Sequence, residues 1–225
     1  GGAGYGLWSY NDWKKENILH LLYFANTNYD VNMGAVGRIG GDTSAYNRIR
    51  NIVSGFTLPL VGQYKCGYRP TVDSEGNAVN CLNFFGIEGM GEQIWEFVIG
   101  FRHNGTTCFV WDENAWSEIH AGDYTFNLVN NAVSAQYIKK IIAGENFDLL
   151  PREVAASATT GFCDAHWVNS SGRLLLVGGY AGSGSLCGLS ASCANNAFSN
   201  SDAVIGSRLA FIGEPETVDG SELLS

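Results

Sequence analysis

Charged residues are scarce in this sequence, and basic residues are fewer than acidic ones. They make up 16% of the 225 residues, with 13 lysines and arginines against 22 aspartates and glutamates, for a net charge of −9. Basic residues are adjacent only at Lys14–Lys15 and Lys139–Lys140. Nucleic-acid binding requires clustered positive charge, so we expect no nucleic-acid partner. No run of 18 apolar residues occurs, so we also expect no membrane insertion.

The chain has few residues suited to metal binding. It holds six cysteines without a CxxC pair and four histidines far apart in sequence. A structural zinc site needs closely spaced pairs of such ligands, so we expect no metal and no cofactor. Cys66 and Cys81 are spaced to form a disulfide around a turn, although free buried thiols are the favoured state in a chain of this size.

Apolar residues and glycine are abundant. Hydrophobic residues make up 45% of the chain, aromatic residues 12%, and glycine contributes 29 positions. This composition is typical of a turn-rich α+β domain with a sizeable core. Apolar spacing predicts a helix that starts at Asn11–Asp12 and runs to Asn26, and a second helix over Ala132–Ala143 that ends before Gly144.

The strand predictions rest on alternation and on turn residues. Two β-type runs, 93–101 and 107–111, flank Asn104–Gly105 and predict a hairpin. Three further strands are expected at 173–177, 186–194 and 207–212. Alternation within 186–194 predicts that Leu186, Ser190 and Ser192 share an exposed face while Leu189, Ala191 and Cys193 pack inward.

Several single residues have an expected structural role. Trp95, Trp111 and Trp167 are predicted to lie in the core. Glu96 is expected to be a strand residue in a polar network, and Arg208 to be buried and paired.

One 40-residue window lacks five residue types. Lys, Glu, Gln, Trp and Met account for 28 of the 225 residues, which predicts about five in any 40, yet residues 174–213 contain none. Codons reached from AAC or AAT by changing adenines encode none of these five. The window therefore fits adenine-directed diversification. The alternative is an ordinary Gly/Ser/Asn-rich connection between strands.

Motifs around this window resemble a known family. Residues 83–98, NFFGIEGMGEQIWEFV, resemble a segment of C-type-lectin-fold domains of the formylglycine-generating-enzyme subtype. The runs at 161–167, 173–179, 184–189 and 199–209 are similar to the variable proteins of diversity-generating retroelements, and LLYFANTN at 21–28 resembles their phage and prophage members.

The resemblance implies a C-type lectin fold of α+β class, with two helices, short antiparallel strands and long loops. It implies one domain over 1–213, in which 1–10 includes a linker and 174–213 is the variable region, followed by a loose acidic tail at 214–225. In such proteins a reverse transcriptase copies a template with errors at adenines, and the scaffold displays the altered side chains.

The implied function is ligand binding without catalysis. The chain would form the tip of a phage tail and recognise a bacterial surface receptor, either protein or glycan. Its oligomeric state is left open, with a homotrimer as one option. The family pattern and the Asn-codon argument together select ten diversified, ligand-binding positions: Tyr180, Gly182, Ser183, Leu186, Ser190, Ser192, Asn195, Asn196, Asp202 and Val204.

Three alternatives remain at this point. The first is a bacterial surface-displayed adhesin that uses the same residues. The second is a fold-sharing copper oxidase, in which Cys187 and Cys193 would be the metal-binding pair. The third is a purely structural virion protein, which predicts no hypervariability. Calcium-dependent sugar binding is not supported, because the Glu-Pro-Asn type of loop is missing.

Overall fold

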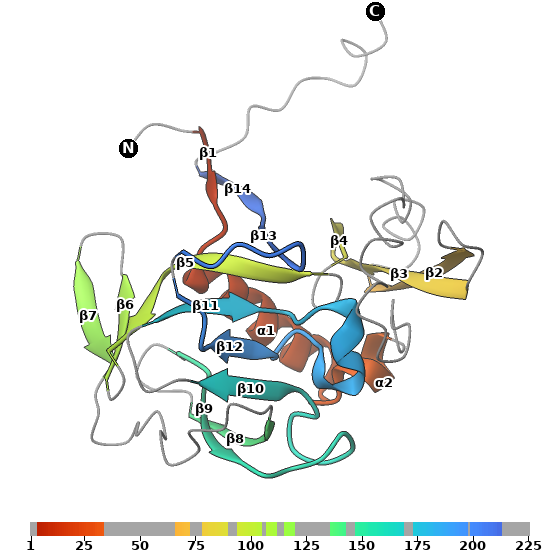
Figure 1. The fold of residues 1–225 in the computed structure, drawn as a ribbon. Coiled ribbons are helices and arrows are strands. Elements are labelled where there is room, and N and C mark those ends of the chain that lie inside the picture. Colours follow the sequence, from red (N-terminus) through yellow and green to blue (C-terminus); the bar gives the residue numbers. More distant parts are fainter. Residues whose placement is uncertain are drawn as a thin grey trace, which may run out of the picture.

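The computed structural model describes residues 4–33, 66–72, 78–89, 94–104, 107–111, 115–119, 136–142, 147–168, 173–197 and 199–212. Two helices and many strands make the described part a mixed α+β fold (Figure 1). Its helical elements are α1 (Tyr10–Phe24), α2 (Tyr29–Met33) and the 3₁₀ helix η2 (Ala181–Leu186). Its strands are β1 (Gly4–Leu7), β2 (Cys66–Val72), β3 (Ala78–Phe84), β4 (Ile87–Glu88), β5 (Trp95–His103), β6 (Cys108–Trp111), β7 (Trp116–Ile119), β8 (Gln136–Ile142), β9 (Leu150–Val154), β10 (Ala165–Val168), β11 (Arg173–Val177), β12 (Ser192–Ala194), β13 (Ile205–Ser207) and β14 (Leu209–Ile212).

Helix α1 begins slightly earlier than the sequence predicts. Ser9, rather than Asn11–Asp12, is its N-cap, and Ser9 and Asp12 form a reciprocal capping box. The helix ends at Ala25, which adopts a left-handed conformation. Its buried face carries Tyr10, Trp13, Asn17 and His20, at the helical spacing that brings side chains to one side. The predicted first helix is therefore confirmed, with its start shifted by a serine cap.

A nine-stranded sheet dominates the described residues. Its path runs β7-β6-β5-β11-β12-β10-β8-β9, and β13 pairs with β5 in parallel. The predicted hairpin is confirmed as β5–β6, and the predicted strand 173–177 is β11. Smaller sheets are formed by β2-β3-β4 and by β1-β14, which projects from the body (Figure 1).

The central strands have two apolar faces. One face packs against α1 (Figure 1). There Val98, Leu175 and Val177 join Tyr10 and Trp13 in the main core. Because side chains alternate along a strand, the residues between them point to the other face. There the register aligns Phe97, Leu176, Cys193 and Trp167 in one row across β5, β11, β12 and β10.

The predicted second helix, Ala132–Ala143, is wrong. Residues 136–142 form strand β8, which pairs with β9 and β10; residues 132–135 lie outside the described part. Ile138 is fully buried, while Lys139 and Lys140 both form ion pairs with Glu153. Pairing on both sides of the strand outweighs the local helical pattern, because sheet formation depends strongly on tertiary context.

Residues 4–10 do not form the expected linker. Residues 4–7 are β1, paired with β14, and Tyr10 already belongs to α1. The predicted strand 207–212 is present as β13 and β14, which divide at Arg208. The acidic tail, 214–225, lies outside the described residues. Within the described residues, no helix is long and apolar enough to cross a membrane.

Candidate ligand-binding surface

Loops cover the sheet face opposite α1. A small cluster of Trp95, Leu176 and Cys193 lies on this face, and Tyr180 and Val204 pack against it. The ring of Trp167 meets Trp95 edge to face, with centroids 5.1 Å apart. Tyr180 follows β11 by three residues and Val204 precedes β13 by one. Residues from two loops therefore meet above the side chains of Trp95, Phe97 and Trp167, which we call the aromatic floor.

The loop that carries Val204 also joins this surface at its other end, next to Cys193 of β12. The Cys193 thiol donates to Asn195 Oδ1 at 2.9 Å and accepts from Asn196 Nδ2 at 3.1 Å. Asn200 Nδ2 donates to Asn196 Oδ1 at 2.7 Å, which links the chain further along the same loop. Burial raises the pKa of Cys193 to about 11, so the thiol stays neutral and acts as a packing and hydrogen-bonding group.

Helix η2 places Tyr180 directly against Gly182. A Cβ added at Gly182 would lie 2.6 Å from Tyr180 Cε2, so any side chain at this position must displace the tyrosine ring. The Ser183 N–H donates to the Tyr180 carbonyl at 2.8 Å and closes the turn. Positions 180 and 182 are thus sterically coupled, and a change at one alters the shape presented by the other.

Of the ten predicted binding positions, one is exposed and seven are half-buried. Asp202 is exposed and accepts the Val204 N–H at 3.1 Å. Leu186 is half-buried, but it ends η2 and does not begin the predicted strand. We define the loop surface as the seven positions that the contacts above bring together: Tyr180, Gly182, Ser183, Asn195, Asn196, Asp202 and Val204.

Ser190 and Ser192 do not belong to this surface, contrary to the prediction. They are 8% and 2% exposed. The Ser190 hydroxyl donates to Asn17 Oδ1 at 2.9 Å, and its N–H donates to Asp164 Oδ2. The Ser192 hydroxyl bonds His166 Nδ1 at 2.8 Å. Both serines are structural groups beneath α1.

The chain passes under α1 at this point, which explains the error. Only residues 192–194 form a strand, and the segment before them is a turn. Trp13 Nε1 and Asn17 Nδ2 both donate to the Leu189 carbonyl, at 2.9 and 3.1 Å. The helix therefore satisfies the backbone that a strand neighbour would otherwise bond. The predicted inward packing of Leu189, Ala191 and Cys193 is confirmed.

The buried Ser192–His166 pair is not arranged as an open catalytic dyad. His166 is 7% exposed, and desolvation together with nearby His103 lowers its pKa to about 3. The imidazole is therefore neutral at physiological pH, and its hydrogen bond to Ser192 holds β10 against β12. A substrate would have no access to the hydroxyl in this geometry.

The two cysteines of the oxidase alternative bond to different groups. Cys187 is fully buried, and its thiol donates to the Tyr180 carbonyl at 2.9 Å. Cys193 bonds the asparagine side chains of the next loop. Across the described ranges, no group of three or more His, Cys, Asp or Glu residues is placed to hold a metal ion. None of the six cysteines, Cys66 and Cys81 included, forms a disulfide bond.

Sequence reasoning missed the aromatic floor. Phe97 and Trp167 are only half-buried and line the loop-covered face, whereas Trp95 is buried as predicted. The signal was that β5 is apolar at both alternating positions, which indicates two covered faces. Trp111 was predicted to be core but is 40% exposed, at the end of β6.

The ion pair of Glu96 and Arg208 secures the strand that follows the loop surface. Arg208 Nε lies 2.5 Å from Glu96 Oε1, and Glu96 is 5% exposed. The guanidinium also donates to the carbonyls of Glu88 and Gly89 at 2.8 and 2.9 Å. The predicted role of Glu96 is confirmed, and Arg208 is paired as predicted but is half-buried, with 24% of its side chain exposed.

The chain was compared with known proteins. A scan against protein-family models finds no match, and a search of curated proteins likewise finds none.

Proposed function

We propose that this chain is a ligand-binding module with a C-type lectin fold, whose loop surface is diversified by adenine-directed retroelement mutagenesis. In this proposal it forms the tip of a phage tail protein and recognises a protein or glycan on the bacterial surface without catalysis. A bacterial surface-displayed adhesin using the same loop surface is the alternative.

One observation carries the proposal. Seven positions chosen from codon content and resemblance come from two separate loops, and both loops contact one cluster: Tyr180 and Val204 pack against it, and Asn195 and Asn196 bond its Cys193. Ordinary turn residues from separate loops would not be expected to contact one cluster of side chains. Loops on a rigid frame that combine a tyrosine with small polar side chains suit adaptable recognition, as in antibody paratopes.

Backbone contacts and a separate core hold much of the frame beneath these loops. Backbone hydrogen bonds hold the loop ends, including the Trp95 N–H to the Val204 carbonyl at 2.8 Å and the Gly178 N–H to the Ala191 carbonyl at 2.9 Å. The main core lies on the other side of the sheet, against α1. Changes at the loop surface therefore leave most of the folding energy untouched, as a diversified site requires.

We expect substitution of Tyr180 by alanine to abolish or greatly weaken binding to receptor-bearing cells, by about tenfold to a hundredfold, because a central tyrosine is a typical binding hot spot. The melting temperature of the Tyr180→Ala variant should change little, since the tyrosine ring is only half-buried. The measurement is retention of labelled protein on a panel of bacterial strains, with Asn196→Ala as a second surface variant.

Tyr68→Ala is the matched control. Tyr68 is 47% exposed on β2, in the separate three-stranded sheet, so its loss should leave cell binding unchanged. If Tyr180→Ala and Asn196→Ala bound every strain as well as the parent protein did, the loop surface would not be the recognition site.

A further inference from the structure

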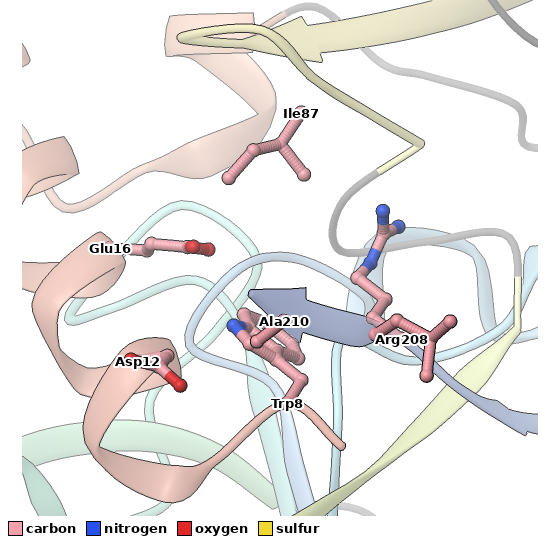
Figure 2. Close-up of a pocket in the computed structure, with 7 residues that line it drawn as sticks. Trp8, Asp12, Glu16, Ile87, Arg208 and Ala210 are labelled. Carbon is pink, nitrogen blue, oxygen red and sulfur yellow. The ribbon is translucent and has the colours of Figure 1, made fainter. Parts of the chain in front are cut away.

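A cleft lies between α1 and the β4–β14 side of the molecule. Its volume is about 440 Å³. Trp8, Ile87 and Ala210 supply apolar walls, and Asp12 and Glu16 project from the first turns of α1 (Figure 2). None of these residues belongs to the loop surface. The cleft is therefore a second concave site, with its own chemistry.

Carboxyl groups predominate among the polar groups around the cleft. Asp12 and Glu16 line it, and buried Glu96 is close enough to Glu16 to affect its titration. Arg208 is the one cation among the lining residues. Its guanidinium is already occupied by Glu96 and two backbone carbonyls, so it offers little to an incoming anion. Lys15 pairs with Asp12 at 3.7 Å, but this lysine is largely exposed to solvent.

Glu16 has unused hydrogen-bonding capacity. The Trp8 side chain donates a hydrogen bond to it, yet its Oε2 atom is shielded from solvent and has no hydrogen-bond partner. In Figure 2 the carboxyl group points from α1 into the space below Ile87. A buried carboxyl oxygen without a partner is costly. Rotation of the Glu16 side chain toward a donor in the cleft would remove that cost.

We propose that this cleft binds a small organic cation: a primary ammonium group carrying a short apolar chain. The ammonium group would donate to the carboxylates of Glu16 and Asp12, and the chain would lie against Trp8, Ile87 and Ala210. The indole ring of Trp8 adds a face that attracts cations. A divalent metal fits less well, because half of the lining is apolar and hard cations require several oxygen ligands.

Protonation of Glu16 opposes this binding. Desolvation raises the pKa of Glu16 to about 8; Arg208 lowers it, while Asp12 and Glu96 raise it. Other charged groups on the surrounding elements are Lys14 and Lys15 on α1, which pair with Asp148 and Asp12, and Glu88 on β4. At pH 6 the carboxyl is mostly neutral, and above pH 8 it is mostly ionised. Affinity for an ammonium ion should therefore rise as the pH rises from 6 to 8.5.

The test titrates n-butylammonium into the full chain and follows the Trp8 indole N–H by NMR at pH 6 and pH 8.5. We expect a dissociation constant in the millimolar range at pH 8.5, typical for so small a ligand, and about tenfold weaker binding at pH 6. Glu16→Gln should weaken binding at pH 8.5 by about tenfold or more and remove its pH dependence.

Two further variants keep the test decisive. Glu153→Gln removes one charge from a carboxylate outside the cleft, so it should bind like the parent protein. Ala210→Phe fills the cleft while retaining every charge, so it should abolish binding. Saturable binding that Glu16→Gln and Ala210→Phe leave unchanged would overturn the proposal, as would the absence of any saturable shift of Trp8 in the folded parent protein.

Discussion

Replacement of Gly188 by alanine is expected to destabilise the fold by about 3–5 kcal/mol. Gly188 has a φ of +153°, and an added Cβ would lie 2.2 Å from Asp164 Oδ1 and 2.4 Å from Oδ2. Asp164 is 1% exposed, and its Oδ2 accepts the Ser190 N–H at 2.9 Å. The carboxylate has no open space to move into, so the substitution must break this buried hydrogen bond.

Urea denaturation of the two proteins gives the comparison, and Gly184→Ala is the matched control. Gly184 also has a positive φ, +56°, but an added Cβ there meets nothing within 4 Å. The Gly184→Ala variant should lose only the stability that the unfavourable backbone conformation costs, about 1–3 kcal/mol. Equal losses at the two positions would mean that the contact with Asp164 is unimportant and that backbone strain alone requires glycine.

The second large effect is expected at Arg208. Arg208→Met leaves the Glu96 carboxyl, 95% removed from solvent, without its counter-ion, and should destabilise the fold by about 3–5 kcal/mol. It also removes donors to the carbonyls of Glu88 and Gly89. The attachment of β14 to the strands next to the loop surface would weaken, because Arg208 links β14 to β5 and to the end of β4.

This loss should depend on pH in a defined direction. Burial raises the pKa of Glu96 and Arg208 opposes that rise. Without Arg208 the folded-state pKa rises further above the unfolded value, so the folded variant retains the proton and is penalised as the pH increases. The destabilisation measured by urea denaturation should therefore shrink at acidic pH.

The double variant Glu96→Gln/Arg208→Met separates charge from packing. If the unpaired carboxylate causes the loss, the double variant should recover part of the stability at neutral pH. A double variant as unstable as Arg208→Met, with no pH dependence in either, would show that the backbone hydrogen bonds of Arg208 matter and its charge does not.

Elements with a strong local signal were predictable from the sequence. Helix α1, the β5–β6 hairpin and strand β11 follow from periodicity and from Asn-Gly turn chemistry. β8 was not predictable in this way, because AVSAQYIKKIIA has helical spacing and only its pairing with β9 and β10 makes it a strand. Local preference was outweighed there by contacts distant in sequence.

The same limit applies to the candidate site. Residue types selected the loop positions, and Tyr180, Asn196 and Val204 do lie near one another. Alternation was a poor guide between 186 and 191, where η2 and a turn replace the extended strand and Ser190 lies beneath α1. No local sequence pattern predicts that a helix residue such as Asn17 will form hydrogen bonds with this segment.

Sequencing the 3′ end of the gene across a growing population tests the central claim most directly. The account predicts substitutions at the seven loop-surface codons, matched by a nearby near-copy carrying AAC or AAT at those sites beside a reverse transcriptase gene. Codons for Gly188, Ser190 and Ser192 should stay constant, because their side chains or backbones are buried and bonded. A uniform sequence without a template copy, or variation as frequent at Ser190 and Ser192 as at Tyr180, would contradict it.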